Sequence, residues 1–188
     1  MPKSAPRHTS GRSSSPAQAP TVAVVVSRYN ESVTFRLRDG ALAEYAHRYP
    51  QAPGGSVVII EAPGAYELPV LTLAAAESDR FDGVVALGCL IKGETRHDRY
   101  IAEAVAQGLI NVTIATGIPA AFGVLTVDTP KQAQARAGGS AGNKGQEAMA
   151  AVLDTIEQIR ILQDLPVATR GGGSSSKPDK ASGKGARR

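Results

Sequence analysis

Residues 92–100 hold the densest group of reactive side chains in the chain, with seven ionisable residues among nine. They directly follow the apolar run 83–91, and the end of a buried strand is where a parallel sheet presents side chains to a ligand. His97 lies in this segment, on a predicted loop, and an imidazole can both accept and donate a proton near neutral pH. His8 lies in a polar tail, and His47 falls late in a predicted helix on its solvated side. A loop histidine is often only a surface residue, so the proton-transfer role predicted for His97 depends on this placement.

The segment 27–31 (SRYNE) ends the first apolar run. Tyr29 could offer a flat face to a heteroaromatic ring, and Asn30 could cap the following helix. The plainer interpretation, ordinary capping beside an aromatic at the edge of the core, stays open.

The segment 63–67 (PGAYE) ends the second run. Gly64 and Ala65 would let a ligand approach the backbone, and Glu67 could accept hydrogen bonds from hydroxyl groups. A first-turn carboxylate that only stabilises the helix dipole is the simpler alternative for Glu67.

The stretch 131–144 (KQAQARAGGSAGNK) carries Arg136 and Lys144 on either side of three glycines. A guanidinium offers paired donors that suit a phosphate group. The glycine-rich part differs from a nucleotide-binding P-loop, because Lys144 follows Asn143 and precedes Gly145, and because the loop follows a helix. The sequence therefore indicates phosphate binding without a nucleoside triphosphate.

The elements that must position these residues alternate along the chain. Strands are predicted at 21–27, 56–60, 83–91 and 119–126, and helices at 31–49, 66–77, 99–115, 130–137 and 145–162. Apolar strands that are each followed by a helix predict an α/β, three-layer α/β/α sandwich with a four-stranded parallel, doubly wound sheet. Ligands of such sheets bind beyond the carboxyl ends of the strands, where the segments above fall.

Charge and composition bound the remaining possibilities. Residues 1–20 carry a net charge of +3 and residues 166–188 carry +5, which leaves −4 on residues 21–165, the predicted folded domain. Both tails are expected to be disordered and basic, so the charge pattern disfavours nucleic-acid binding except through them. One cysteine excludes a disulfide framework and a multi-cysteine metal site, so no metal is expected. Without an apolar leader or a spanning segment, the chain is predicted to be cytoplasmic, with no membrane contact.

Five motifs in order resemble the 6,7-dimethyl-8-ribityllumazine synthase family, over residues 21 to about 162. They are SRYNE, PGAYELP, LGCLIKGETRH, AFGVLTVDTPKQAQARAG and AGNKGQEA. The resemblance implies a flavodoxin-like fold and a transferase of riboflavin biosynthesis that needs no cofactor. It would condense 5-amino-6-(D-ribitylamino)uracil with 3,4-dihydroxy-2-butanone 4-phosphate, through an imine, phosphate elimination and ring closure, to 6,7-dimethyl-8-ribityllumazine, phosphate and water.

The resemblance also implies residue roles. His97 would transfer protons, and Glu94, Thr95 and Arg136 would bind the butanone phosphate. The ribitylaminouracil would contact Tyr29, Ala65, Tyr66, Glu67, Cys89, Leu90, Ile91 and, from a neighbouring subunit, Phe122. Asn30, Asp98 and Lys144 would support the site. Asp98-Arg99 replaces the aromatic and acidic residues usual after the histidine, so the residue that orients His97 is open, with Asp98 the nearest candidate.

A pentamer is the assembly that the resemblance implies, with the active site at a subunit interface. The short AGGSAGNKG connection favours an icosahedral shell of pentamers, for which riboflavin synthase is a candidate cargo. Two alternatives stay open: a non-catalytic binder of flavins or lumazines, and a structural shell protein on the same scaffold. A flavodoxin-type electron carrier is disfavoured, because SRYNE replaces the Ser/Thr-rich phosphate loop expected after the first strand.

Overall fold

The computed structural model describes residues 18–52 and 56–166. In chain order its elements are β1 (Val22–Ser27), α1 (Glu31–Arg48), β2 (Val57–Ala62), α2 (Leu68–Ala76), β3 (Gly83–Ile91), α3 (His97–Thr116), β4 (Ala120–Val127), α4 (Pro130–Arg136), β5 (Ala137–Gly139), β6 (Gly142–Asn143) and α5 (Lys144–Asp164). The tails predicted at 1–20 and 166–188 fall almost entirely outside the described residues.

The four long strands form one parallel sheet in the order β2-β1-β3-β4. All six residues of β1 are buried, as are the first eight of β3, because these central strands are covered on both faces. Their β-branched and apolar side chains suit this position. The sheet therefore has two edges, β2 and β4.

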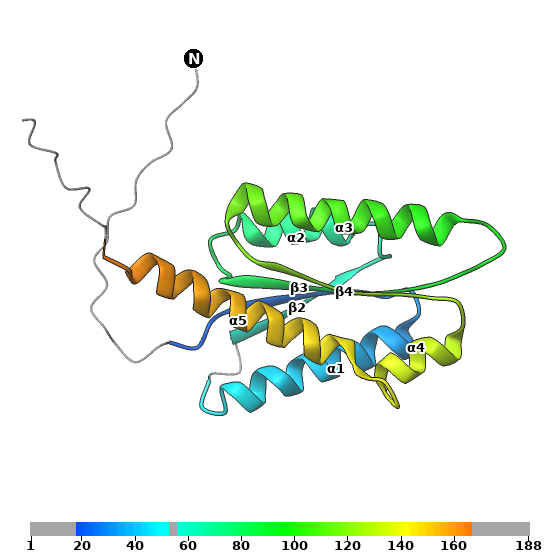
Figure 1. The fold of residues 1–188 in the computed structure, drawn as a ribbon, viewed down its shortest axis with the longest axis horizontal. Coiled ribbons are helices and arrows are strands. Elements are labelled where there is room, and N and C mark those ends of the chain that lie inside the picture. The colour runs from blue at the N-terminus through cyan, green and yellow to red at the C-terminus, as the bar shows by residue number, and fades with distance from the viewer. Residues whose placement is uncertain (1–17, 53–55, 167–188) are drawn as a thin grey trace, which may run out of the picture.

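Helices cover both faces of the sheet, which makes three layers (Figure 1). Helices α2 and α3 lie on one face, over a core that includes Val25, Leu68 and Leu109. Helices α1, α4 and α5 lie on the other face, over a core that includes Leu37 and Met149. The prediction of a doubly wound α/β sandwich with four parallel strands is confirmed.

Two element predictions were wrong where the site begins. Helix α3 starts at His97 rather than at residue 99, so His97 occupies the first helical position and not a loop. Helix α2 starts at Leu68 rather than at residue 66, so Tyr66 and Glu67 belong to the preceding turn. The β5–β6 hairpin was not predicted at all. Gly138 (φ 91°) and Gly142 (φ 75°) adopt left-handed backbone there, which glycine allows at little cost.

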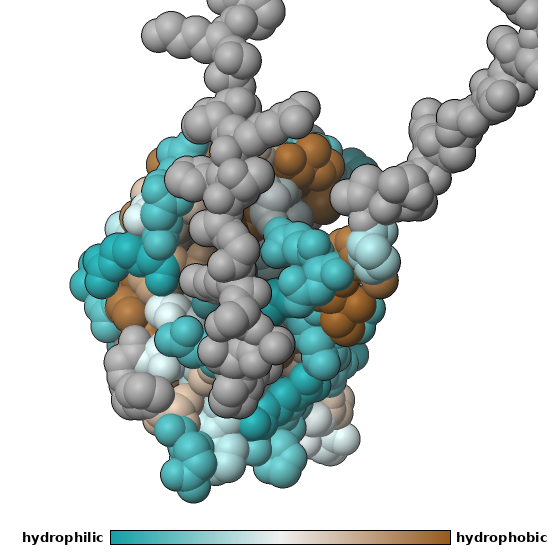
Figure 2. All heavy atoms as spheres, turned by 90° about the vertical axis from the view of Figure 1, so that its left-hand side faces the viewer, coloured by the Kyte–Doolittle hydropathy of each residue, from teal (hydrophilic) through white to brown (hydrophobic). Residues whose placement is uncertain are grey.

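The carboxyl ends of the strands point away from the end of the molecule where α5 finishes (Figure 1). The end where α5 finishes shows apolar side chains in separate groups among hydrophilic ones (Figure 2). Ile161, Leu162 and Leu165, at the C-terminal end of α5, are exposed. Among residues 18–52 and 56–166, no helix is long and apolar enough to cross a membrane.

Candidate active site

Tyr29 and Asn30 form the turn that follows β1. The Tyr29 side chain is 69% exposed, so its ring is free to receive a flat ligand. Asn30 has a left-handed backbone (φ 62°), and its side chain does not cap α1, which corrects the capping prediction. Its Nδ2 donates instead to the carbonyl oxygen of Cys89, at 2.9 Å. Asn30 therefore joins the end of β1 to the end of β3.

Ala65, Tyr66 and Glu67 form the turn between β2 and α2. Ala65 is buried, whereas Tyr66 is 65% exposed. A Cβ added to Gly64 would lie 2.9 Å from Oε2 of Glu67, so the carboxylate folds back over the glycine backbone. The turn thus offers one carboxylate and an exposed ring beside the open end of β2.

The last residues of β3 extend past its pairing with β1, which ends at Val26 and Leu87. Cys89 and Leu90 are buried and Ile91 is half-buried in this extension. Burial raises the pKa of the Cys89 thiol to about 11, so the thiol stays protonated at neutral pH and is a poor nucleophile. This segment can therefore contact a ligand mainly through backbone groups.

The loop from β3 to α3 carries Glu94 and Thr95, which are exposed, as is His97 in the first turn of α3. Among the described residues, no hydrogen bond joins the imidazole of His97 to a protein partner. Asp98, the next residue, is half-buried and lines a cavity at the carboxyl end of β4.

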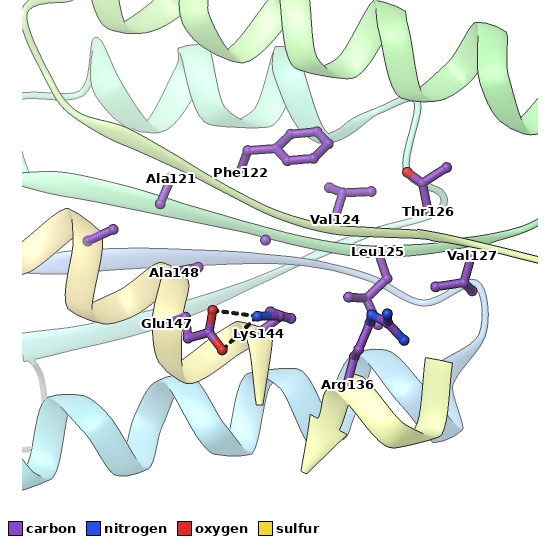
Figure 3. Close-up of a pocket in the computed structure, with 12 residues that line it drawn as sticks. Ala121, Phe122, Val124, Leu125, Thr126, Val127, Arg136, Lys144, Glu147 and Ala148 are labelled. Carbon is purple, nitrogen blue, oxygen red and sulfur yellow. Dashed lines mark hydrogen bonds and ion pairs between the residues drawn. The ribbon is translucent and has the colours of Figure 1, made fainter. Parts of the chain in front are cut away.

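A cavity of about 420 Å³ opens along the edge strand β4. Its lining includes Phe122, Arg136, Lys144 and Glu147 (Figure 3). The Phe122 ring lies on the α3 side of β4, whereas Arg136 and Lys144 lie on the α1 side (Figure 3). Both Oε atoms of Glu147 accept from Nζ of Lys144, at 2.8 and 2.7 Å. The cavity therefore combines an aromatic ring, the Arg136 guanidinium and the Lys144–Glu147 ion pair at an uncovered sheet edge.

A second cavity, of about 270 Å³, lies at the carboxyl end of β4, and Arg136 lines this one too. Asp98, Asp128 and Gln132 share it. The Oε1 atom of Gln132 accepts from the backbone N–H of Asp128 at 2.8 Å, and its carbonyl oxygen accepts from Nη1 of Arg136 at 3.3 Å. Arg136 thus lies between the two cavities.

The predicted site residues fall into two groups. Those at the strand ends lie on the turns after β1 and β2, on the last residues of β3, and on the loop and first turn that lead into α3. Those at the β4 edge are Phe122, Arg136 and Lys144. His97 begins a helix on one face of the sheet and Arg136 ends a helix on the other, and His97 lines neither cavity. Within a single chain, neither cavity therefore brings the imidazole and the guanidinium together.

Three residues of this region were missed by sequence reasoning: Gln132, Asn143 and Glu147. For Gln132 a signal existed, because Thr129 and Gln132 have the spacing of a capping box, and Thr129 Oγ1 accepts from Gln132 N at 3.2 Å. Across residues 18–52 and 56–166, no cluster of three or more metal-binding side chains occurs.

The fold and the site define a doubly wound α/β protein with a polar small-molecule site at the carboxyl edge of its sheet. A model of the 6,7-dimethyl-8-ribityllumazine synthase family matches residues 19–160. Proteins with that name from two strains of Thermus thermophilus are 45% identical over 149 residues, covering 79% of this chain and 92% of theirs. The 6,7-dimethyl-8-ribityllumazine synthase 1 of Caulobacter vibrioides is 44% identical over 149 residues, covering 79% of this chain and 96% of its own.

The chain therefore belongs to the 6,7-dimethyl-8-ribityllumazine synthase family. It is a transferase of riboflavin biosynthesis, and nothing in the relatives supports a non-catalytic binder or a purely structural shell protein. Membership also implies small-molecule substrates and an oligomeric assembly.

Proposed function

We propose that the chain condenses 5-amino-6-(D-ribitylamino)uracil with 3,4-dihydroxy-2-butanone 4-phosphate in a site shared between two subunits. One subunit supplies the strand-end group and His97, and its neighbour supplies Phe122, Arg136 and Lys144. The single observation behind this division is that these last three residues surround one cavity at the uncovered β4 edge, which His97 does not line.

The strand-end group binds the pyrimidine. Tyr29 stacks on its ring, because the phenol is exposed at the end of β1. Glu67 accepts hydrogen bonds from the ribityl hydroxyls, and Ala65 and Tyr66 line the same turn. Backbone groups of Cys89, Leu90 and Ile91 form hydrogen bonds with the polar edge of the ring. Asn30 holds the Cys89 carbonyl oxygen in place by donating a hydrogen bond to it.

The β4-edge group binds the phosphorylated ketone. Arg136 is half-buried, which strengthens its attraction for a phosphate compared with a fully exposed cation, and Lys144 lies beside it in an ion pair with Glu147. Glu94 and Thr95, on the β3–α3 loop of the subunit that supplies His97, contact the same substrate. The phosphate then leaves from carbon, and the two cations stabilise the charge of the departing group.

His97 moves the protons of the condensation. The uracil amine attacks the ketone carbonyl and water leaves to form an imine, after which phosphate is eliminated. The ribitylamino nitrogen then attacks the remaining carbonyl carbon, and a second water leaves as the ring closes. Each step needs a proton to leave nitrogen or carbon, or to reach a departing oxygen. An exposed imidazole at the start of α3 can serve these steps in turn.

The assembly is a pentamer, and pentamers join into an icosahedral shell in the cytoplasm. An uncovered edge strand with a 44% exposed phenylalanine favours burial against a second copy of the chain. Light scattering after gel filtration tests the shell, and a discrete pentamer as the only species would reject it. Riboflavin synthase inside the shell stays a proposal about cargo.

Absorbance of lumazine formed from the two purified substrates tests the reaction directly. His97→Ala should lower turnover, and Arg136→Ala should mainly raise the KM for the butanone phosphate. Equal effects of both variants on that KM would contradict the division of roles.

A further inference from the structure

Asn143 lies between the two cations of the β4-edge cavity along the chain, and it makes hydrogen bonds in two directions. Its Oδ1 accepts from the backbone N–H groups of Gly145, at 2.9 Å, and Gln146, at 3.2 Å. Its Nδ2 donates to the carbonyl oxygen of Arg36 in α1, at 2.8 Å. The first two bonds are ordinary capping of α5. The third ties the start of α5 to α1, which capping alone does not require.

Two glycines show how closely α1, Asn143 and α5 fit together. A Cβ added to Gly40 would overlap the Asn143 side chain, and a Cβ added to Gly145 would overlap the Leu37 carbonyl group. Only glycine at position 40 leaves room for the Asn143 side chain, and only glycine at position 145 leaves room for the Leu37 carbonyl group. Because the contact is this close, a bulkier group beside Asn143 would push its side chain away from α1, and a shorter side chain at 143 would leave α5 without its bond to the Arg36 carbonyl.

Arg136 and Lys144 lie at the two ends of the β5–β6 hairpin. Arg136 directly precedes β5, which pairs with β6 through Ala137 and Asn143, and Lys144 directly follows Asn143. A displacement of Asn143 from α1 therefore moves both cations relative to the cavity that they line.

We propose that Asn143 is a positioning residue for the phosphate half of the site. Through its bond to the Arg36 carbonyl it holds the β5–β6 hairpin and the first turn of α5 against α1, and so fixes Arg136 and Lys144 around the cavity. This inference rests on the proposed function, because it assumes that the two cations bind the phosphorylated ketone.

Asn143→Ser tests the inference in the assembled enzyme. Serine still caps α5, but its side chain is too short to reach the Arg36 carbonyl. We expect the KM for the butanone phosphate to rise about tenfold, with kcat and the KM for the pyrimidine changed less than about twofold. Asn111→Ser is the matched control: Asn111 accepts one side-chain bond from Gln107 on α3, lines neither cavity, and should leave both KM values unchanged.

Gly40→Ala gives a second test that leaves Asn143 and its capping bonds chemically intact. Its added methyl group presses on the Asn143 side chain, so the KM for the butanone phosphate should rise selectively here too. If Asn143→Ser is insoluble, Gly40→Ala alone tests the positioning role of Asn143. A wild-type KM for the butanone phosphate, or an equal rise in both KM values, would overturn the positioning role.

Arg136→Ala and Lys144→Ala, measured alongside, separate the two levels of the proposal. If neither raises the KM for the butanone phosphate, the phosphate assignment itself fails. If they do so while Asn143→Ser does not, only the role of Asn143 fails.

Discussion

Asp98→Asn removes one negative charge from the cavity that Arg136 also lines. Asp98 is the second residue of α3 and directly follows His97. No ion pair or hydrogen bond engages its carboxylate among the residues that the structure describes. By contrast, the carboxylate of Asp128 in the same cavity lies 3.9 Å from Nζ of Lys92, which partly balances its charge.

The size of the cavity sets the magnitude of the effect. A sphere of 270 Å³ is about 8 Å across, which is within the screening length of roughly 10 Å in 0.1 M salt. Two unit charges at that distance, with an effective dielectric constant of about 40 to 80, interact by about 0.5 to 1 kcal/mol. Phosphate repelled by Asp98 should therefore bind about two- to fivefold more tightly after the substitution.

The predicted gain in phosphate affinity is tested by competitive inhibition with inorganic phosphate, measured against the butanone phosphate. The inhibition constant should fall in Asp98→Asn, fall less in Asp128→Asn, and the difference should shrink in 1 M salt. Asp98 also lies in the first turn of α3, where a carboxylate stabilises the helix dipole. A lower melting temperature with an unchanged inhibition constant would mean that Asp98 serves only the helix, and would refute the reasoning.

Three other outcomes follow from the site and the fold. His97→Ala should lower kcat by about 10²- to 10⁴-fold, and an unchanged kcat in a steady-state lumazine assay would contradict proton transfer by His97. Because burial raises the pKa of the Cys89 thiol to about 11, iodoacetamide at pH 8 should alkylate the folded protein far more slowly than the denatured one, as mass spectrometry would show; equal rates would contradict its burial. Gly145→Ala should destabilise the fold by more than about 2 kcal/mol, since its methyl group would overlap the Leu37 carbonyl, and an unchanged urea midpoint would contradict the close crossing of α1 and α5.

The sequence predicted the sheet well because its strands are mostly apolar, and β2, which contains Glu61, was predicted to end two residues before it does. The bounds of β3 matched, since the run 83–91 is continuous and ends at a charged residue. The start of α3 was less visible, because Arg96 at its N-cap makes no side-chain capping bond and so leaves no capping signal. The β5–β6 hairpin was missed because its turn depends on the backbone of two glycines and not on a pattern of apolar residues.

The candidate site was predictable in position but not in its contacts. The ends of parallel strands meet at one edge, so the order of elements alone places Tyr29, Glu67 and Cys89 near one another. The bond from Asn30 to Cys89 joins residues 59 positions apart, and no local pattern signals it. Which face of the sheet each helix covers depends on the crossovers between strands. The sequence therefore did not predict that the helices carrying His97 and Arg136 lie on opposite faces of the sheet.

Complementation between subunits tests the shared site most directly. His97→Ala and Arg136→Ala chains, co-expressed in equal amounts, should form mixed oligomers in which some neighbouring pairs join an intact His97 to an intact Arg136. With random mixing and a site that spans two subunits, about one quarter of the sites should be restored. Lumazine formation well above that of either variant alone is the predicted result. Mixed oligomers no more active than the two variants assembled separately would show that both residues must come from one chain.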